Sequence, residues 1–229
     1  MEGAFARPAF KAFIFDLDGT LLHTLPDLVA LTNATLEASG YPPRTDAEIL
    51  SFVGNGARSL MLQAVPAGTP ETAADAALVR WKSLYPTYGH KLTRPFPHIE
   101  ETLSQLHERG ARLGVLSNKF DAGAQDVIAA YLPNTFDAVH GESADYPRKP
   151  NPTGLLRMLA ELGVSPDEAI YIGDSAGDVD VAVAAGVFPI GVTWGYQPVD
   201  CLRERGAKAI IEDPRELLAW SITAEKGAR

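Results

Sequence analysis

Short apolar runs alternate with amphipathic stretches along most of the chain. The apolar runs that predict buried strands lie at residues 10–15, 113–116, 138–140, 169–172, 190–192 and 209–211. The stretches that predict helices between them lie at residues 99–109, 122–131, 152–162 and 179–185. Because apolar strands that alternate with helices form a parallel sheet covered on both faces, the pattern predicts a doubly wound, Rossmann-like α/β fold.

The segment between the first predicted strand and the others contains helical patterns only. Thr24 with Asp27 and Thr45 with Glu48 have the spacing of capping boxes, which begin helices. Pro86 is expected to end or kink the last helix of the segment. The predicted domains are a helical subdomain inserted at residues 23–89 and an α/β core built from residues 1–22 and 90–229.

Composition and charge narrow the classes of partner. Of the 229 residues, 46% are hydrophobic and 21% are charged, which is typical of a soluble globular protein. The net charge of −9 repels nucleic acid and anionic membranes, so we expect neither as a partner. The same charge repels phosphorylated molecules, so any phosphate site must be locally positive. The single cysteine, Cys201, and a start without a signal-like segment favour a cytoplasmic protein.

Polar residues of a few chemical types gather in four short segments, and three of these segments directly follow predicted strands. The segments are Asp16-Leu17-Asp18-Gly19-Thr20, Ser117-Asn118-Lys119, Arg148-Lys149-Pro150, and Gly173-Asp174-Ser175 with Asp178. The carboxyl ends of the strands form the ligand crevice of a doubly wound sheet. Segments that are about 100 residues apart are therefore expected to meet at one site.

The acidic residues of these segments suit a divalent cation. Asp16 and Asp18 are two positions apart on an extended segment, so their carboxylates lie on the same side and repel each other unless a cation or a proton intervenes. Asp174 follows a strand, and Asp178 lies in the first turn of the next helix. Carboxylate oxygens at strand ends fit Mg²⁺, which also binds phosphate oxygens. Asp178 fits a helix N-terminal acid as well, and the first segment fits an acidic turn.

Three further side chains could hold a phosphoryl group. Lys149 offers the cation that an acidic protein needs beside a phosphate, and Ser117 with Asn118 offers a hydroxyl and an amide for its oxygens. Taken alone, Lys149 also fits a solvated surface lysine, and Ser117 with Asn118 also fits a helix cap. The four segments together favour chemistry on a phosphate ester.

In this order, the four segments resemble the four motifs of the haloacid dehalogenase superfamily, and the resemblance covers nearly the whole chain. Further segments resemble the phosphoglycolate phosphatase branch of that superfamily, namely Pro26-Asp27-Leu28, Gly54-Asn55-Gly56-Ala57 and Val192-Thr193-Trp194-Gly195. The resemblance implies a phosphatase whose helical insertion is a mobile cap over the site. It also implies a small phosphorylated metabolite as the substrate and Mg²⁺ as the cofactor.

The resemblance also implies a role for each matching residue. Asp16 attacks phosphorus and forms an aspartyl-phosphate, while Asp18 protonates the leaving oxygen and then activates the hydrolytic water. The implied Mg²⁺ ligands are Asp16, the backbone carbonyl of Asp18, Asp174 and Asp178, and the implied phosphoryl-binding residues are Thr20, Ser117 and Lys149. The positions that depart from the usual pattern are His23-Thr24 in place of Asp-Ser, His98 in place of a frequent glycine and Arg148 in place of a lysine.

Other functions share part of this pattern. A dehalogenase of the superfamily would lack Asp18, because its reaction needs no acid for the leaving group, whereas a phosphomutase keeps all four motifs. A non-enzymatic receiver domain also accepts phosphate on an acidic cluster, but it has about half this length and no helical insertion. Dinucleotide binding at Gly54-Asn55-Gly56 is not favoured, since no strand precedes the segment and no third glycine follows at the required spacing.

Discrimination among phosphate esters is expected from the helical insertion, because the four motifs bind only the phosphoryl group. Gly54, Asn55 and Gly56 separate two predicted helices, so their N–H groups and the Asn55 amide could point into the cleft. Arg58 follows, and its guanidinium could pair with a substrate carboxylate such as that of phosphoglycolate. A plain turn and a solvated Arg58 fit the same residues.

Overall fold

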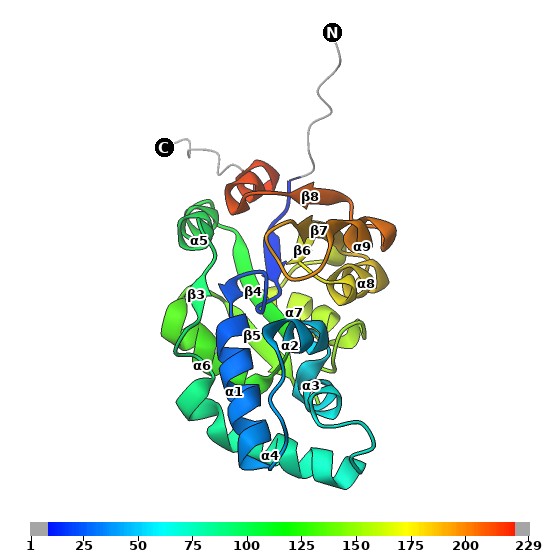
Figure 1. Ribbon diagram of the computed structural model, residues 1–229. Coiled ribbons are helices and arrows are strands. Elements are labelled where there is room, and N and C mark those ends of the chain that lie inside the picture. Colours follow the sequence, from blue (N-terminus) through cyan, green and yellow to red (C-terminus); the bar gives the residue numbers. More distant parts are fainter. Residues whose placement is uncertain (1–8, 223–229) are drawn as a thin grey trace, which may run out of the picture.

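The computed structural model of the protein describes residues 9–222 and contains a six-stranded sheet. Its strands are β1 (Ala12–Phe15), β4 (Arg112–Phe120), β5 (Ala138–Glu142), β6 (Ala169–Gly173), β7 (Phe188–Val192) and β8 (Ala209–Ile211). All neighbouring strands are parallel, and the order across the sheet is β5-β4-β1-β6-β7-β8 (Figure 1). β1 therefore lies between β4 and β6, and the predicted doubly wound sheet is confirmed.

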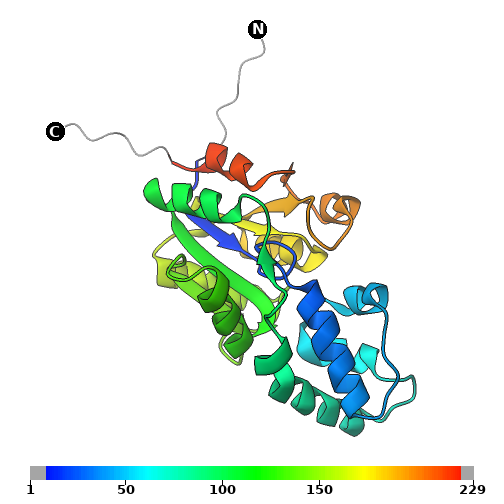
Figure 2. The same cartoon turned by 60° about the vertical axis from the view of Figure 1, so that its left-hand side comes forward.

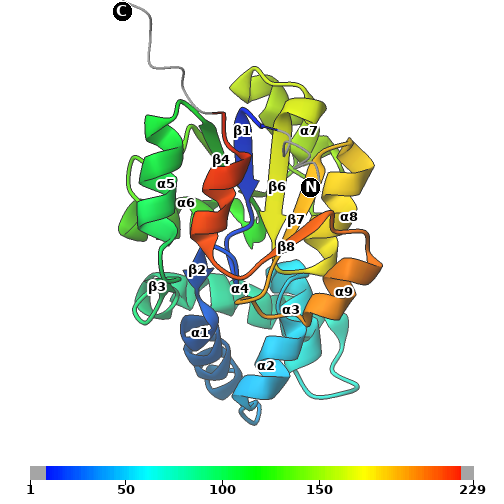
Figure 3. The same ribbon diagram turned by 90° about the horizontal axis from the view of Figure 1, so that it is seen from above.

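Helices cover both faces of this sheet (Figure 3). One face is covered by α5 (Ile99–Glu108), α6 (Asp121–Tyr131) and the 3₁₀ helix η2 (Pro214–Trp220), and the other by α7 (Thr153–Leu162) and α8 (Ala176–Ala185). The shorter helices are η1 (Pro166–Glu168), which precedes β6, and α9 (Val199–Glu204), which packs against β7 and α8. Along β1, Phe13 and Phe15 face α5 and α6, whereas Ala12 and Ile14 face α7 and α8. Because helices cover both faces of the sheet at this point, β1 is apolar at every position.

Four helices form a separate layer beyond the carboxyl ends of the strands (Figure 1, Figure 2). They are α1 (Leu25–Ala38), α2 (Asp46–Phe52), α3 (Gly56–Ala64) and α4 (Glu71–Tyr88), and we refer to them as the helical block. The block has its own apolar core, in which Leu31, Met61 and Trp81 are almost fully buried. Within residues 9–222, none of the helices has the length and apolar character that crossing a membrane requires.

The helix ends of the block agree only in part with the sequence predictions. The capping box of Thr45 and Glu48 forms at the start of α2, as predicted. The predicted box of Thr24 and Asp27 is wrong, because the Thr24 side chain makes no capping hydrogen bond. Pro86 does not end α4, which runs two residues further to Tyr88. A proline in the last turn removes only one helical hydrogen bond, so the helix can continue past it.

Two linkers join the helical block to the sheet, and the sequence patterns predicted neither. β2 (Leu22–His23) and β3 (Arg94–Pro95) pair as antiparallel strands, so the chain leaves and re-enters the sheet domain side by side. Asp27 is 1% exposed and accepts hydrogen bonds from the N–H groups of residues 91–93 and from the Thr93 hydroxyl, at 2.6–2.9 Å. The Asp27 carboxylate on α1 therefore anchors the returning linker.

Asp27→Asn is expected to lower the free energy of unfolding by about 2 kcal/mol, because the amide keeps the shape but turns N–H groups toward the donors of residues 91–93. Urea unfolding followed by circular dichroism measures the change. The control is Asp46→Asn in the exposed first turn of α2, which should change stability by no more than about 0.5 kcal/mol. Equal stability of the two variants would contradict the anchoring role of Asp27.

Candidate active site

A cavity of about 360 Å³ lies between the carboxyl ends of the strands and the helical block. The predicted site residues that line it are Asp16, Asp18, Gly54, Gly56, Ser117, Asn118 and Asp174. Thr20, Lys149 and Asp178 do not line the cavity, but their side chains contact residues that do. Segments that are far apart in the sequence thus meet at this edge of the sheet.

Lys149 lies beneath the cavity at the centre of a buried ionic cluster. Its Nζ is 2.7 Å from Asp16 Oδ1 and 2.7 Å from Asp178 Oδ1, and it donates to the Tyr171 hydroxyl at 3.0 Å. Tyr171 in turn donates to the Leu116 carbonyl at 2.6 Å, which ties the cluster to β4. Burial lowers the pKa of Lys149, but the two carboxylates outweigh burial and raise it well above its usual value. Lys149 therefore stays charged and holds the Asp16 carboxylate in place.

Asp174 is held firmly at the end of β6. Its Oδ1 accepts from the Thr20 hydroxyl at 3.0 Å, and its Oδ2 accepts from Tyr196 N at 2.7 Å. Gly19 and Gly195 pack against it so closely that a Cβ on Gly19 would lie 2.4 Å from Oδ2, and one on Gly195 would lie 2.0 Å from Asp174 Cβ. Gly19 also has a φ of +90°, which favours glycine. The Thr20 hydroxyl is thus engaged by Asp174, whereas the resemblance assigns it to a phosphoryl oxygen.

Asp18 faces the cavity beside a second buried lysine. Lys119 Nζ is 3.2 Å from Asp18 Oδ1 and 3.5 Å from Asp18 Oδ2. Ser117 precedes Lys119 on β4 and also lines the cavity, and its Oγ accepts from Lys119 N at 3.2 Å. Asp16 and Asp18 therefore each pair with a different lysine.

Asn118 connects the helical block to the sheet domain. Its Nδ2 donates to Gly54 O at 2.8 Å, and its Oδ1 accepts from Lys149 N at 2.7 Å. The carbonyl of Asn55, next along the α2–α3 loop, accepts from the Arg148 guanidinium. Both polar atoms of the Asn118 side chain are thus used on backbone groups, so it docks the α2–α3 loop onto the strand ends.

Arg58 lies on the exposed surface of the helical block and does not line the cavity. Its guanidinium is 2.8 Å from Asp75 Oδ1 and 3.2 Å from Glu71 Oε2, and these pairs join α3 to α4. Two acids of the protein, rather than a substrate carboxylate, therefore neutralise Arg58. The geometry does not support the predicted contact between Arg58 and a substrate.

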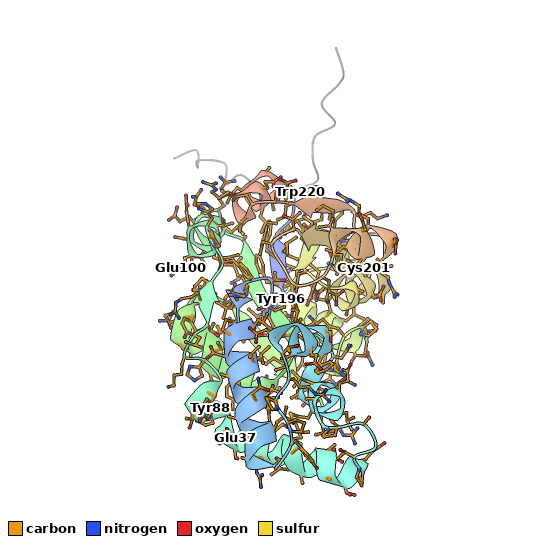
Figure 4. The ribbon with its side chains drawn as sticks, in the orientation of Figure 1. Glu37, Tyr88, Glu100, Tyr196, Cys201 and Trp220 are labelled. Atoms are coloured by element: carbon orange, nitrogen blue, oxygen red, sulfur yellow. The ribbon has the colours of Figure 1, made fainter. Side chains whose placement is uncertain are left out.

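Tyr196 connects Asp174 to the start of the helical block, and Figure 4 shows it between the sheet and α1. Its hydroxyl accepts from Thr24 N at 2.8 Å and from Leu25 N at 3.0 Å, where α1 begins without a side-chain cap of its own. His23 Nδ1 lies 3.4 Å from the same hydroxyl. Tyr196 therefore caps α1 from the sheet domain.

The carboxylates on the floor of the cavity fit a divalent cation. One oxygen from each of Asp16, Asp174 and Asp178 lies within 4.8 Å of the other two. Burial, followed by the charges of neighbouring carboxylates, raises the pKa of Asp16 to about 6 and that of Asp174 to about 8. The cluster therefore carries more negative charge than Lys149 offsets, and its hard oxygen donors suit a metal such as Mg²⁺.

Sequence reasoning assigned no role to three side chains that shape this site. Lys119 belongs to one of the four polar segments, and a lysine that continues an apolar strand was the available signal. Tyr171 lies within an apolar run and reads as core, although its hydroxyl positions Lys149. Tyr196 lies in a loop after β7, and no local pattern indicates that it reaches α1.

Comparison with known proteins agrees with this arrangement. Residues 13–192 match the sequence model of the haloacid dehalogenase-like hydrolases. Phosphoglycolate phosphatase 1 of Pseudomonas aeruginosa is 32% identical over 225 residues, which cover 95% of this chain and 82% of that protein. The phosphoglycolate phosphatase of Rhodospirillum rubrum is 36% identical over 221 residues, which cover 92% of this chain and 90% of that protein.

A solved structure also resembles this fold over almost its full length. A haloacid dehalogenase-like family hydrolase from Streptococcus pneumoniae superposes with a TM-score of 0.83 at 25% identity, covering 92% of this chain and 98% of that one. These matches confirm the resemblance that the four polar segments indicated.

Proposed function

Because the chain belongs to the haloacid dehalogenase-like hydrolase family and is a phosphatase, we propose that it cleaves a small phosphate monoester through an aspartyl-phosphate on Asp16. The observation that carries the proposal is the buried cluster in which Lys149 lies 2.7 Å from Asp16, beside Asp174 and Asp178. Phosphoryl transfer needs positioning and charge stabilisation above all, and this cluster offers both at the floor of a cavity.

The proposed reaction uses the two aspartates of the first segment in turn. Asp16 attacks phosphorus, and Lys149 keeps its carboxylate oriented. Asp18, which lines the same cavity, protonates the ester oxygen of the leaving alcohol. It then takes a proton from the water that attacks the aspartyl-phosphate, so that phosphate is released and the Asp16 carboxylate is restored. Ser117 lines the cavity and donates its hydroxyl to a phosphoryl oxygen.

Mg²⁺ is the proposed cofactor, held by Asp16, the backbone carbonyl of Asp18 and Asp174, with Asp178 in support. When bound, the ion would neutralise the clustered carboxylates and polarise the phosphoryl oxygens. Thr20 and Tyr196 serve this site by fixing both oxygens of Asp174.

Residues 23–89 are proposed to form the cap, over a core built from residues 1–22 and 90–229. Two observations support this division: the helical block has a separate apolar core, and Leu28 and Leu60 of the block line the same cavity as Asp16. A cap excludes water from the reacting phosphate and commits the bound substrate to reaction.

The proposed substrate is phosphoglycolate or an ester of similar size. Relatives that align with most of the chain are phosphoglycolate phosphatases. Release of inorganic phosphate from 2-phosphoglycolate tests the activity, and it also separates a hydrolase from a phosphomutase, which returns the phosphoryl group to a second hydroxyl.

Asp18→Asn is expected to accumulate a phosphorylated protein when it is mixed with 4-nitrophenyl phosphate. The good leaving group still departs without an acid, but no base then activates the hydrolytic water. Steady-state turnover should fall by roughly 10²- to 10⁴-fold, and acid quenching followed by intact-protein mass spectrometry should show one added phosphoryl group. Wild-type turnover with no phosphorylated species would count against the two-step reaction.

A further inference from the structure

Lys119 is a buried cation in the cavity wall, on the same side as Asp18. Only 3% of its side chain is exposed, yet the residue lines the cavity. Its Nζ lies 3.2 Å from Asp18 Oδ1 and 5.5 Å from the centre of the Tyr85 ring. Burying an ammonium costs free energy unless anionic or aromatic partners compensate it, and Asp18 and Tyr85 provide this compensation, so the cavity wall holds a charged lysine.

The rest of the cavity wall offers no other side-chain cation. Among residues 9–222, Lys119 is the only lysine or arginine that lines the cavity. Lys149 lies beneath the floor of the cavity, where it pairs with Asp16 and Asp178. The large apolar residues of the wall are Leu28, Leu50, Val53, Leu60, Trp81 and Phe120. A second anionic group on the substrate would therefore find a cationic side chain only at Lys119.

The proposed reaction determines which part of the substrate approaches Lys119. Asp18 must come within about 2.6–3.2 Å of the ester oxygen in order to protonate it. Because Lys119 pairs with this same carboxylate, it lies on the leaving-group side of phosphorus. In the phosphate ester of a 2-hydroxy acid, one carbon separates the ester oxygen from the carboxylate, so the carboxylate can reach the ammonium.

Resting on the proposed function, we propose that Lys119 binds the carboxylate of the substrate and thereby selects phosphate esters of short 2-hydroxy acids over esters of neutral alcohols. A charge-assisted hydrogen bond is strong at this ammonium, because the side chain is buried and little water competes for it. Lys119 thus takes the role that the sequence suggested for Arg58, which does not line the cavity.

The test compares 2-phosphoglycolate with 2-hydroxyethyl phosphate, which has a similar size but an alcohol in place of the carboxylate. The measured quantity is the ratio of the two kcat/KM values, because any effect of Lys119 on Asp18 acts on both substrates and cancels. Lys119→Met is expected to lower this ratio about 10- to 100-fold, mainly through KM for 2-phosphoglycolate. Lys119→Arg should restore most of the ratio. Lys82→Met is the matched control, since Lys82 is exposed over the Phe120 ring and does not line the cavity.

The outcomes separate this inference from the proposed function. An unchanged ratio in Lys119→Met would overturn the inference and show that Lys119 acts through Asp18 alone. The wild-type protein provides a test without variants: its kcat/KM should be at least about tenfold higher for 2-phosphoglycolate, and equal values overturn the inference. Hydrolysis of both esters without preference, lost in Asp16→Asn, removes only the selection by Lys119. Hydrolysis of neither ester nor of any other phosphate monoester removes the proposed function and the selection with it.

Discussion

Asp16→Asn is expected to abolish phosphate release, with kcat lower by at least about 10⁴-fold, because an amide cannot replace the attacking carboxylate. The fold should persist. Burial raises the pKa of Asp16 to about 6, so removing its charge relieves an unfavourable burial while Lys149 keeps Asp178 as a partner at 2.7 Å. Phosphate release at saturating substrate measures the first effect, and urea unfolding measures the second.

The matched control for this experiment is Asp180→Asn. Asp180 lies on α8 outside the cavity and pairs with Arg205 at 3.2 Å, so its replacement should leave turnover within about twofold of the wild-type value. If Asp16→Asn retains turnover comparable to that of Asp180→Asn, Asp16 is not the nucleophile.

Removal of divalent metal is expected to abolish turnover, and addition of Mg²⁺ is expected to restore it. In metal-free protein, Asp16, Asp174 and Asp178 offer their oxygens within 4.8 Å of one another, with only Lys149 to offset their charge. A phosphate dianion would then be repelled rather than bound. The loss should reach roughly 10³-fold or more, since several kcal/mol of charge stabilisation disappear. Full turnover in well-chelated buffer would contradict the proposed cofactor.

Metal binding also has a readout that is independent of turnover. Since its pKa is raised to about 8, Asp174 holds a proton at neutral pH in metal-free protein, and a bound cation must displace this proton. Mg²⁺ should therefore raise Tm more at pH 8 than at pH 6. Without metal, stability should fall as the pH rises from 3.8 to about 8 and level off above it, because the pKa of Asp174 is raised in the fold from 3.8 to about 8. A Tm shift by Mg²⁺ that does not depend on pH would argue against binding at Asp174.

The sheet and the acidic floor were predictable because local patterns determine both. β1 and β6 are buried on two faces, so they stand out as continuous apolar runs without any knowledge of their neighbours. Asp16 and Asp174 directly follow two of these runs, and parallel strands end at one shared edge. Their placement at one edge of the sheet therefore follows from the order of elements, whereas the pairing of β1 with β6 is seen only in the structure.

The contacts that fix the helical block could not be predicted, because each joins segments that are distant in the sequence. Asp27 looked like a helix-capping acid, yet it binds the linker at residues 91–93. Arg58 closely follows a segment that was expected to face the cleft, but only the packing of α3 on α4 shows that Asp75 neutralises it. In both cases the sequence shows a charged side chain with several possible partners, and the partner is determined only by the tertiary packing.

Because β2 pairs with β3, the helical block is inserted between two adjacent points of the chain and could be exchanged as one unit, or cassette. Its entry and exit strands lie side by side, so an insertion from another enzyme with the same two ends could be spliced in at residues 23 and 94 without moving the sheet. Asp27 and the donors at residues 91–93 would travel inside the cassette, while Tyr196 would stay behind. A grafted insertion would need free N–H groups in its first turn to meet the Tyr196 hydroxyl, and loop carbonyls to meet Asn118 and Arg148. Chimeras built at these two joints could therefore acquire new substrate ranges above an unaltered cluster of Asp16, Asp174 and Asp178.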